Sequence, residues 1–529
     1  MRFLLINPHY PLSENPSPPL GLAYLAAVLE KEGIEVKVSD FVVNPYSKNF
    51  IESVINSYRP DVVCATSVTM TFDNAVEIIK DVKSIAPDVL TVMGGPHVSF
   101  CAEEMMNAHP ELDLVVIGEG EDTIIELIDA INNKKAWNDI NGIAYRNGKE
   151  IVETESRKTW VDVNSLPIPA RHLLPLGRYK ALNMAISMTT SRGCPFKCIF
   201  CVGRKMVGAK VRYRNPGNVV DELEYLGSLG FPQINIADDL FTANKRHCID
   251  VCDEIISRNL KLKWSSFARV DTVSLDVLKK MKEAGCTAVS FGVETGNPEI
   301  LKTIKKGITL DQVIAAVDMC NEAGIIPTVS FILGLPGETP ETMDETIAFG
   351  EKLKKMGVLH GFHLLAPFPG TKIREESEKL GIKILTDDWS QYHANRAIVE
   401  TQTVSREMFD EFIIGWDKKF DDYLGRISEL METGQATEEE ANTIINLERT
   451  VLLYDLMMDC KVEEDGFWRN QDMPDSDEDV LRILANRLLK STEYSQEKLL
   501  ETLKFSAERG YLRYLKDKDL IRWEWVDFL

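Results

Sequence analysis

Short apolar runs that alternate with amphipathic segments constrain the fold of this 529-residue chain more than any other feature. In the first 140 residues, helical patterns separate five such runs, at 3–6, 35–41, 62–66, 89–93 and 114–117. Fully apolar strands separated by helices are typical of a parallel sheet covered on both faces. We therefore expect an α/β fold whose N-terminal domain, residues 1–140, is a doubly wound, Rossmann-like sheet.

Small and polar residues follow three of these predicted strands. They are Asn7, Ser67 and Thr69, and the run Gly94, Gly95, Pro96 and His97. In open α/β sheets, ligands bind outside the carboxyl ends of the strands, and glycines let a backbone approach a bulky ligand closely. The three loops therefore predict a ligand site, although glycines after a strand can also simply turn the chain.

A second alternating series of strands and helices occupies residues 184–385. Its six predicted strands, each followed by a helix, indicate a partial (β/α)6 barrel with its loops gathered at one face. Residues 141–183 join the two series as a hairpin, which turns at Asn147-Gly148, and a proline-marked linker. Residues 386–529 show helical patterns, and we expect a C-terminal helical domain that binds the substrate or caps the site.

Three of the ten cysteines, Cys194, Cys198 and Cys201, stand at C-x3-C-x2-C spacing in the loop after the first predicted barrel strand. Thiolates are the usual ligands of iron–sulfur clusters, and a cluster of four irons normally takes four of them. Three ligands leave one iron open, which favours chemistry over a purely structural role. The alternatives are a structural zinc site, for which His172 and His247 lie far away in the sequence, and a chance grouping of buried cysteines.

Composition narrows the classes of protein and partner. The formal net charge is −22 and no long Lys/Arg run is present, so we expect no nucleic acid partner. No apolar run is long enough for a transmembrane segment, and the N-terminus lacks a signal-peptide layout. Cysteines grouped in one loop rather than spread as a disulfide framework fit a reducing compartment. We therefore expect a cytoplasmic protein.

The cysteine loop, with Phe200 just before its third cysteine, resembles the cluster loop of radical S-adenosylmethionine (SAM) enzymes. The similarity continues in the same order along the barrel. Residues 290–295 resemble the family's ribose-binding strand end, and residues 331–338 resemble its strand near the adenine. The resemblance implies a 4Fe-4S cluster and SAM as cofactors.

The first domain resembles the cobalamin-binding domain of the cobalamin-dependent radical SAM subgroup, in residues 18–26, the Ser67 loop and residues 94–97. That subgroup contains class B methylase-like enzymes and is related to the anaerobic magnesium-protoporphyrin ester cyclase. The motif Asp-x-His-x-x-Gly is absent, so the resemblance implies cobalamin bound without a histidine ligand to cobalt. Together the resemblances cover most of residues 1–385.

The resemblance also implies roles for single residues. Those expected to contact SAM are Phe200, Asp238, Arg269, Ser290, Glu294 and Gly334, and those expected to contact cobalamin are Asn7, Ser67, Thr69, Gly94, Gly95, Pro96 and His97. Arg269 suits the SAM carboxylate because a guanidinium matches a carboxylate with two hydrogen bonds. The alternative for Arg269 is an ion pair with Asp271 or Glu294, and the alternative for His97 is a hydrogen bond within its loop.

The reaction implied by the resemblance begins when the open iron binds the amino and carboxylate groups of SAM. An electron donor of the ferredoxin or flavodoxin type then drives cleavage to methionine and a 5′-deoxyadenosyl radical, which abstracts hydrogen from an unactivated carbon. Cobalamin in the same chain favours a methyltransferase. An oxidative cyclase or rearrangement enzyme, and a non-catalytic corrinoid or redox sensor, are the alternatives. The substrate can be a small molecule, a lipid or a peptide.

Overall fold

The computed structural model describes residues 1–14, 16–469, 476–517 and 520–528. Its first domain is built on a sheet with strand order β2-β1-β3-β4-β5-β6-β7, and the first five of these strands are parallel. The strands are β1 Arg2–Asn7, β2 Glu35–Asp40, β3 Val62–Thr66, β4 Leu90–Gly94, β5 Leu114–Val116, β6 Ile143–Asn147 and β7 Glu150–Glu153. The predicted doubly wound domain is confirmed.

Helices cover both faces of this sheet because its central strands, such as β1 and β3, are buried on both sides. Alternate β1 residues point to opposite sides, so Phe3 and Leu5 pack with α1 and α5 while Leu4 and Ile6 pack with α2, α3 and α4. The helices are α1 Leu20–Lys31, α2 Lys48–Tyr58, α3 Phe72–Ile85, α4 Ala102–Ala108 and α5 Glu121–Asn133. The hairpin predicted around Asn147-Gly148 forms β6 and β7 and extends the sheet beyond β5 in antiparallel fashion.

The second series forms six parallel strands in the order of the sequence, β8-β11-β12-β13-β14-β15, as expected for a partial barrel. The strands are β8 Ile186–Met188, β11 Ile234–Ile236, β12 Trp264–Ala268, β13 Cys286–Glu294, β14 Ile326–Leu333 and β15 Leu359–Leu364. The connecting helices are α8 Pro216–Ser228, α9 Lys245–Ser257, α10 Leu275–Glu283, α11 Pro298–Thr303, α12 Leu310–Ala323 and α13 Pro340–Lys355. Cys248 and Cys252 are fully buried on α9 and belong to the core of the barrel.

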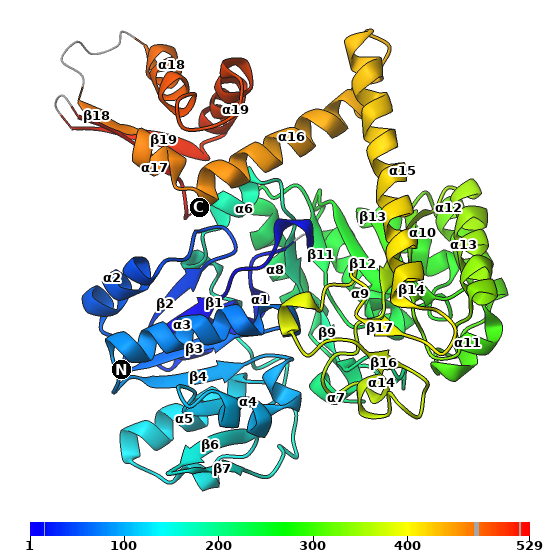
Figure 1. The fold of residues 1–529 in the computed structure, drawn as a ribbon, viewed down its shortest axis with the longest axis horizontal. Helices are drawn as coiled ribbons and strands as arrows, with labels where there is room; N and C mark the ends of the chain where they lie inside the picture. The colour runs from blue at the N-terminus through cyan, green and yellow to red at the C-terminus, as the bar shows by residue number, and fades with distance from the viewer. Residues whose placement is uncertain (15, 470–475, 518–519, 529) are drawn as a thin grey trace.

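Two long helices leave the barrel and return to the first domain (Figure 1). Helix α15, Arg406–Glu432, starts on the barrel and projects beyond it, and α16, Glu438–Met458, leads back to a C-terminal lobe. The lobe contains α17 Lys461–Asp465, α18 Asp477–Leu488, α19 Gln496–Glu508 and a sheet of β18 Phe467–Arg469, β20 Leu520–Trp525 and β19 Leu512–Asp517. The helical character is as predicted, but the sheet was not expected from the sequence.

The lobe is anchored through α6, Leu176–Ala181, which precedes the first barrel strand. Arg178 forms ion pairs with Asp527 at 2.6 Å and Glu463 at 3.1 Å. The Tyr179 hydroxyl donates to Asp40 of the first domain at 2.8 Å. The lobe therefore packs against α6 and the first domain, and its role as a cap over the site stays a prediction. No helix among the described residues has the length and apolar character needed to cross a membrane.

Candidate cofactor site between the two α/β domains

The cysteine loop leaves the carboxyl end of the first barrel strand through β9, Ser191–Arg192. Gly193 has φ +120°, and a Cβ there would lie 2.5 Å from the carbonyl oxygen of Lys210, so the turn into Cys194 requires glycine. The Gly193 N–H donates to Asp239 at 3.2 Å. Asp239 follows the second barrel strand and so connects the loop to its neighbour in the barrel.

Backbone hydrogen bonds on both sides hold the middle of the loop. The Ile199 N–H donates to the carbonyl of Ile304 at 3.1 Å, and its own carbonyl accepts from Ile373 at 3.1 Å. Ile199 is buried, whereas the following Cys201 is exposed. The Gly203 N–H, at the start of α7 (Gly203–Val207), points at the Cys201 sulfur at 3.3 Å. The loop is therefore fixed at its centre and open to solvent near its third cysteine.

Two buried cations lie beside the loop. The Lys306 ammonium forms an ion pair with Glu294 at 2.6 Å and lies 5.8 Å from the ring centroid of Phe200. The Arg269 guanidinium lies 3.5 Å from the ring centroid of Phe196. Together these residues form a wall of two cations and two aromatic rings along the cysteine loop. Each cation is paired with a carboxylate, Lys306 with Glu294 and Arg269 with Asp271, so the wall shapes this side of the loop without a net positive charge.

The three thiols are close enough to affect one another's ionisation. Burial raises the pKa of Cys198, the charge of Lys306 and then of Arg269 opposes this rise, and the nearby Cys194 adds to it. Among the described residues, no three His, Cys, Asp or Glu side chains converge as a single metal ion would require. Cluster thiolates bind different irons, so they need not converge. The donor set fits a cluster held by Cys194, Cys198 and Cys201.

The first domain has a cavity of about 280 Å³ at the carboxyl ends of its strands. Gly94, Gly95 and Pro96 line it together with apolar residues such as Leu25. Gly95 has φ +106°, and a Cβ there would clash with the backbone of the Ser67 loop. The wall opposite the strands includes Met206 and Val207 of α7, directly after the cysteine loop. A glycine-lined, apolar cavity of this kind fits the flat heterocyclic parts of cobalamin.

Ion pairs connect the two domains next to this cavity. Glu119, after the fifth strand of the first domain, accepts two hydrogen bonds from Arg212 at 2.8 and 2.9 Å and one from Arg192 at 3.3 Å. Arg192 also pairs with Glu121 at 2.7 Å. Burial disfavours the Arg192 charge, but Glu121 and Glu119 outweigh it and raise the pKa of the guanidinium. These four residues, which we call the interdomain latch, fix the cysteine loop relative to the cavity.

Both domains match known families. The B12 binding domain family matches residues 13–128, and the radical SAM superfamily matches residues 188–350. An uncharacterized methyltransferase of Pyrococcus horikoshii is 36% identical over 75% of this chain and 86% of its own length. The chain belongs to the cobalamin-dependent radical SAM family. Its cofactors are accordingly a 4Fe-4S cluster, SAM and cobalamin, and it is an enzyme.

Two further relatives of this radical SAM enzyme differ in their named activities. The anaerobic magnesium-protoporphyrin IX monomethyl ester cyclase of Rubrivivax gelatinosus is 29% identical over 79% of this chain and 77% of its own length. The structure of the radical SAM methyltransferase TsrM from Kitasatospora setae, with cobalamin and a [4Fe-4S] cluster bound, aligns with a TM-score of 0.64. At 20% identity over 96% of this chain and 99% of that one, it supports the fold.

Within the radical SAM barrel, Asp238 and Arg269 are engaged by other protein groups. Asp238 is buried and accepts hydrogen bonds from the backbone and hydroxyl groups of Thr190 and Ser191, at 2.5 to 3.1 Å. Arg269 forms a two-point ion pair with Asp271 at 2.9 Å, the alternative that the sequence analysis left open. Contact of either residue with SAM therefore stays a prediction.

Of the other three barrel residues expected to contact SAM, Glu294 and Gly334 lie at or directly after strand ends, whereas Ser290 lies in the middle of β13. Ser290 on β13 shares a hydrogen bond of 2.6 Å with Thr328 on β14. Glu294 ends β13 with φ +73°, after an irregularity in the strand pairing. Gly334 ends β14 with φ +93°, and its N–H donates to the Glu338 carboxylate. Positive φ at Glu294 is unusual for a residue other than glycine and indicates local strain at this strand end.

The residues predicted to contact cobalamin divide into two groups. Gly94, Gly95 and Pro96 line the cavity, as described above. The side chains of the others are directed elsewhere: Asn7 donates to Asp40 at 2.8 Å, Ser67 contacts the Met93 sulfur, and Thr69 contacts His97 at 3.3 Å. Their contact with cobalamin stays a prediction.

His97 is buried between two aromatic rings rather than in the cavity. Its ring centroid lies 4.4 Å from that of Phe72 and 4.8 Å from that of Trp389. Burial and then the charge of Arg374 lower the pKa of His97 to about 4, so the ring is neutral at pH 7. The side-chain contacts of His97 with Phe72, Trp389 and Thr69 thus lie outside its own loop, and its contact with cobalamin stays a prediction.

Several residues of the site could not be recognised in the sequence. Lys306 comes after the short helix α11, in a loop without a pattern, and pairs with Glu294 only in the folded barrel. The interdomain latch joins Glu119 to arginines more than seventy residues away. A faint signal was available for the latch, because glutamates follow one predicted strand and arginines flank the cysteine loop.

Proposed function

We propose that this enzyme transfers a SAM-derived methyl group, by way of cobalamin, to an unactivated carbon of its substrate. The observation that carries the proposal is the position of α7. Its residues Met206 and Val207 line the first-domain cavity, and the helix directly follows the last cluster cysteine. A cobalamin in that cavity and a cluster on the loop would therefore face one reaction space.

The chain's own residues bind, orient and shield the cofactors. Cys194, Cys198 and Cys201 would hold the cluster, and the ion pairs of Lys306 with Glu294 and of Arg269 with Asp271 would line one side of it. The latch and the glycines of the first-domain loops would hold cobalamin next to it, while the apolar wall excludes water. Once bound, the three cofactors supply one-electron reduction, hydrogen abstraction and methyl transfer.

The proposal is tested with reconstituted enzyme, reductant and methyl-labelled SAM, with product analysis on extracts from cells that contain the substrate. We expect 5′-deoxyadenosine to form and the label to reach a carbon of the product. Cys198→Ala, which removes one cluster ligand, is the control and should give neither result. The labelled product would also show whether the substrate is a small molecule, a lipid or a peptide.

Ring formation is the second candidate function, favoured by the similarity to the ester cyclase. A cyclase would form 5′-deoxyadenosine but transfer no label to the product. A non-catalytic sensor would give no SAM cleavage, and its cluster spectra would stay unchanged when SAM is added. Either result contradicts the methyltransferase proposal.

We also propose a cytoplasmic location, because the cluster needs Cys194, Cys198 and Cys201 as free thiols and a reducing compartment keeps them so. We further propose that the electron donor is an acidic protein of the ferredoxin or flavodoxin type. The exposed side chains Lys197, Lys205 and Lys210 lie within ten residues of Cys201 in the sequence, in a chain whose net charge is −22, and Lys205 pairs with Glu375 at 2.7 Å. A local positive surface of this kind attracts an acidic partner and raises its association rate.

The donor surface can be tested apart from the chemistry. Lys197→Glu/Lys210→Glu should lower flavodoxin-driven SAM cleavage by about tenfold at low salt while leaving dithionite-driven cleavage unchanged. Lys261→Glu/Lys263→Glu is the matched control, because these exposed lysines precede β12 at the opposite end of the barrel. Equal rates for the two variants with flavodoxin would contradict this docking surface.

A further inference from the structure

Two arginines of the C-terminal lobe stack on one phenylalanine ring. The guanidinium carbons of Arg449, on α16, and Arg509, directly after α19, each lie 3.8 Å from the ring centroid of Phe505. No carboxylate in the described parts of the chain forms an ion pair with either arginine. Burial and then the charge of Arg509 lower the pKa of Arg449, and Glu501 offsets this only in part. Two like charges are thus held together without a directly paired carboxylate, and Glu501 is a charge of opposite sign near Arg449.

A cavity of about 410 Å³ opens beside these arginines. Three separate segments line it: the end of α6, the helix α16, and the chain around Arg509. The polar side chains in its wall carry hydrogen-bond donors and no carboxylate, and they are Lys180, Asn183, Asn442, Asn446, Arg449, Thr450, Arg509 and Tyr511. In a chain with 82 acidic and 60 basic residues, a cavity with three cations and no acid is selective for anions.

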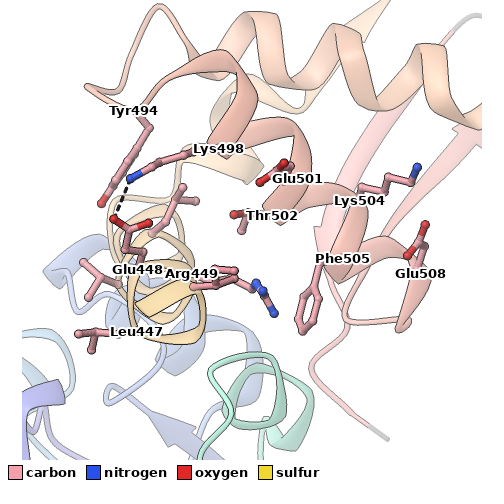
Figure 2. Close-up of a pocket in the computed structure, with 13 residues that line it drawn as sticks. Leu447, Glu448, Arg449, Tyr494, Lys498, Glu501, Thr502, Lys504, Phe505 and Glu508 are labelled. Atoms are coloured by element: carbon pink, nitrogen blue, oxygen red, sulfur yellow. Dashed lines mark hydrogen bonds and ion pairs between the residues drawn. The ribbon is translucent and has the colours of Figure 1, made fainter. Parts of the chain in front are cut away.

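A second cavity of about 660 Å³ shares Arg449 and Phe505 with the first (Figure 2). It lies between α16 and α19, and Figure 2 shows the side chains of Arg449 and Phe505 directed toward one another in it. Its wall includes Ile445 and Val451, which are 40% and 42% exposed. Charged side chains of both signs also line it, and they are Glu448, Glu501, Glu508, Lys498 and Lys504. Exposed apolar side chains in a concave surface are typical of a ligand site. The cationic cavity therefore continues into one with an apolar side.

We propose that the two cavities together bind an amphipathic anion. A phosphate or carboxylate group lies between Arg449 and Arg509, where guanidinium groups form paired, charge-assisted hydrogen bonds. The apolar body of the ligand lies in the neighbouring cavity against Ile445 and Val451. The site is separate from the cofactor site, because Asn183 precedes the first barrel strand whereas the cysteine loop follows it.

The proposal is tested by calorimetric titration of the full-length enzyme with octyl phosphate, inorganic phosphate and octyl glucoside. Octyl phosphate should bind at one site, more tightly than inorganic phosphate or the neutral glucoside. Arg509→Gln, an exposed position, should weaken binding by about tenfold or more, as expected for loss of a hydrogen bond between charged groups. Val451→Ser should weaken octyl phosphate binding and leave inorganic phosphate binding unchanged.

The matched control is Arg482→Gln, which removes an exposed arginine from α18 in the same lobe, and it should bind like the wild type. Vesicles of phosphatidylcholine with and without phosphatidylglycerol distinguish a lipid headgroup from a free amphiphile. Binding of the anionic vesicles that is lost in Arg509→Gln assigns the site to a lipid, and binding of octyl phosphate alone assigns it to a free ligand. Binding that is equal in the wild type and Arg509→Gln, or no binding of either probe, overturns the proposal.

Discussion

Replacing Glu119 by glutamine should weaken the contact between the two cofactor domains. The carboxylate is 6% exposed and pairs with Arg212, which is 15% exposed, and with Arg192, which is 14% exposed. Removing one member of a buried ion pair costs about 3–5 kcal/mol, because the remaining charge is left without a partner. Arg192 keeps Glu121 at 2.7 Å, so only Arg212 loses its carboxylate. We therefore expect the lower end of the range, about 3 kcal/mol.

The assay is urea unfolding of the full-length chain, with the free energy taken from the first transition. A chain of several domains does not unfold in one step, and loss of contact between the first domain and the barrel should come early. The matched control is Glu126→Gln in the same domain. Glu126 pairs with Arg157 at 2.8 Å but is 42% exposed, so its loss should cost less than about 1 kcal/mol.

The same substitution should weaken cobalamin binding, because Arg192 lines the first-domain cavity and precedes the cysteine loop. Titration with hydroxocobalamin, followed by absorbance, measures this effect. If Glu119→Gln unfolds and binds cobalamin like Glu126→Gln, the latch does not hold the two domains together and the reasoning is wrong.

Three further substitutions test single parts of the site. Gly95→Ala should weaken cobalamin binding by at least about tenfold, because a Cβ at φ +106° meets the Ser67 loop, and absorbance titration would show it. Cys201→Ser should lose most of the iron and sulfide after reconstitution and all reductive SAM cleavage, and a variant with full iron content would contradict the cluster assignment. Burial raises the pKa of Glu338 to about 8 from its ordinary 4.5, so the folded state binds this proton more tightly. Its stabilising effect is complete below pH 4.5 and is lost as the pH rises to about 8, so thermal unfolding of Glu338→Gln should depend less on pH over this range.

Most of what the sequence established came from patterns among residues that are close together in the chain. The three cysteines lie within eight residues of one loop, so their spacing alone predicts a shared site. The strands of both α/β units are short apolar runs with helices between them. Backbone geometry sets the spacing of apolar residues in each strand and helix, so this spacing can be recognised in the sequence. Glycines at strand ends, such as Gly95, mark close backbone approach wherever the surrounding fold places them.

Only the tertiary structure decided which charged groups meet. Asp238 and Asp239 are neighbours in the sequence, yet Asp238 holds buried hydroxyl groups while Asp239 holds the cysteine loop. Arg449 and Arg509 belong to separate helical segments and come together only because both pack on Phe505. Charged pairs of this kind depend on distance and burial after folding, and neither quantity leaves a periodic signal in the sequence. The sequence by itself therefore determined the succession of strands and helices and the motifs that imply the cofactors, and the fold decided which side chains meet around them.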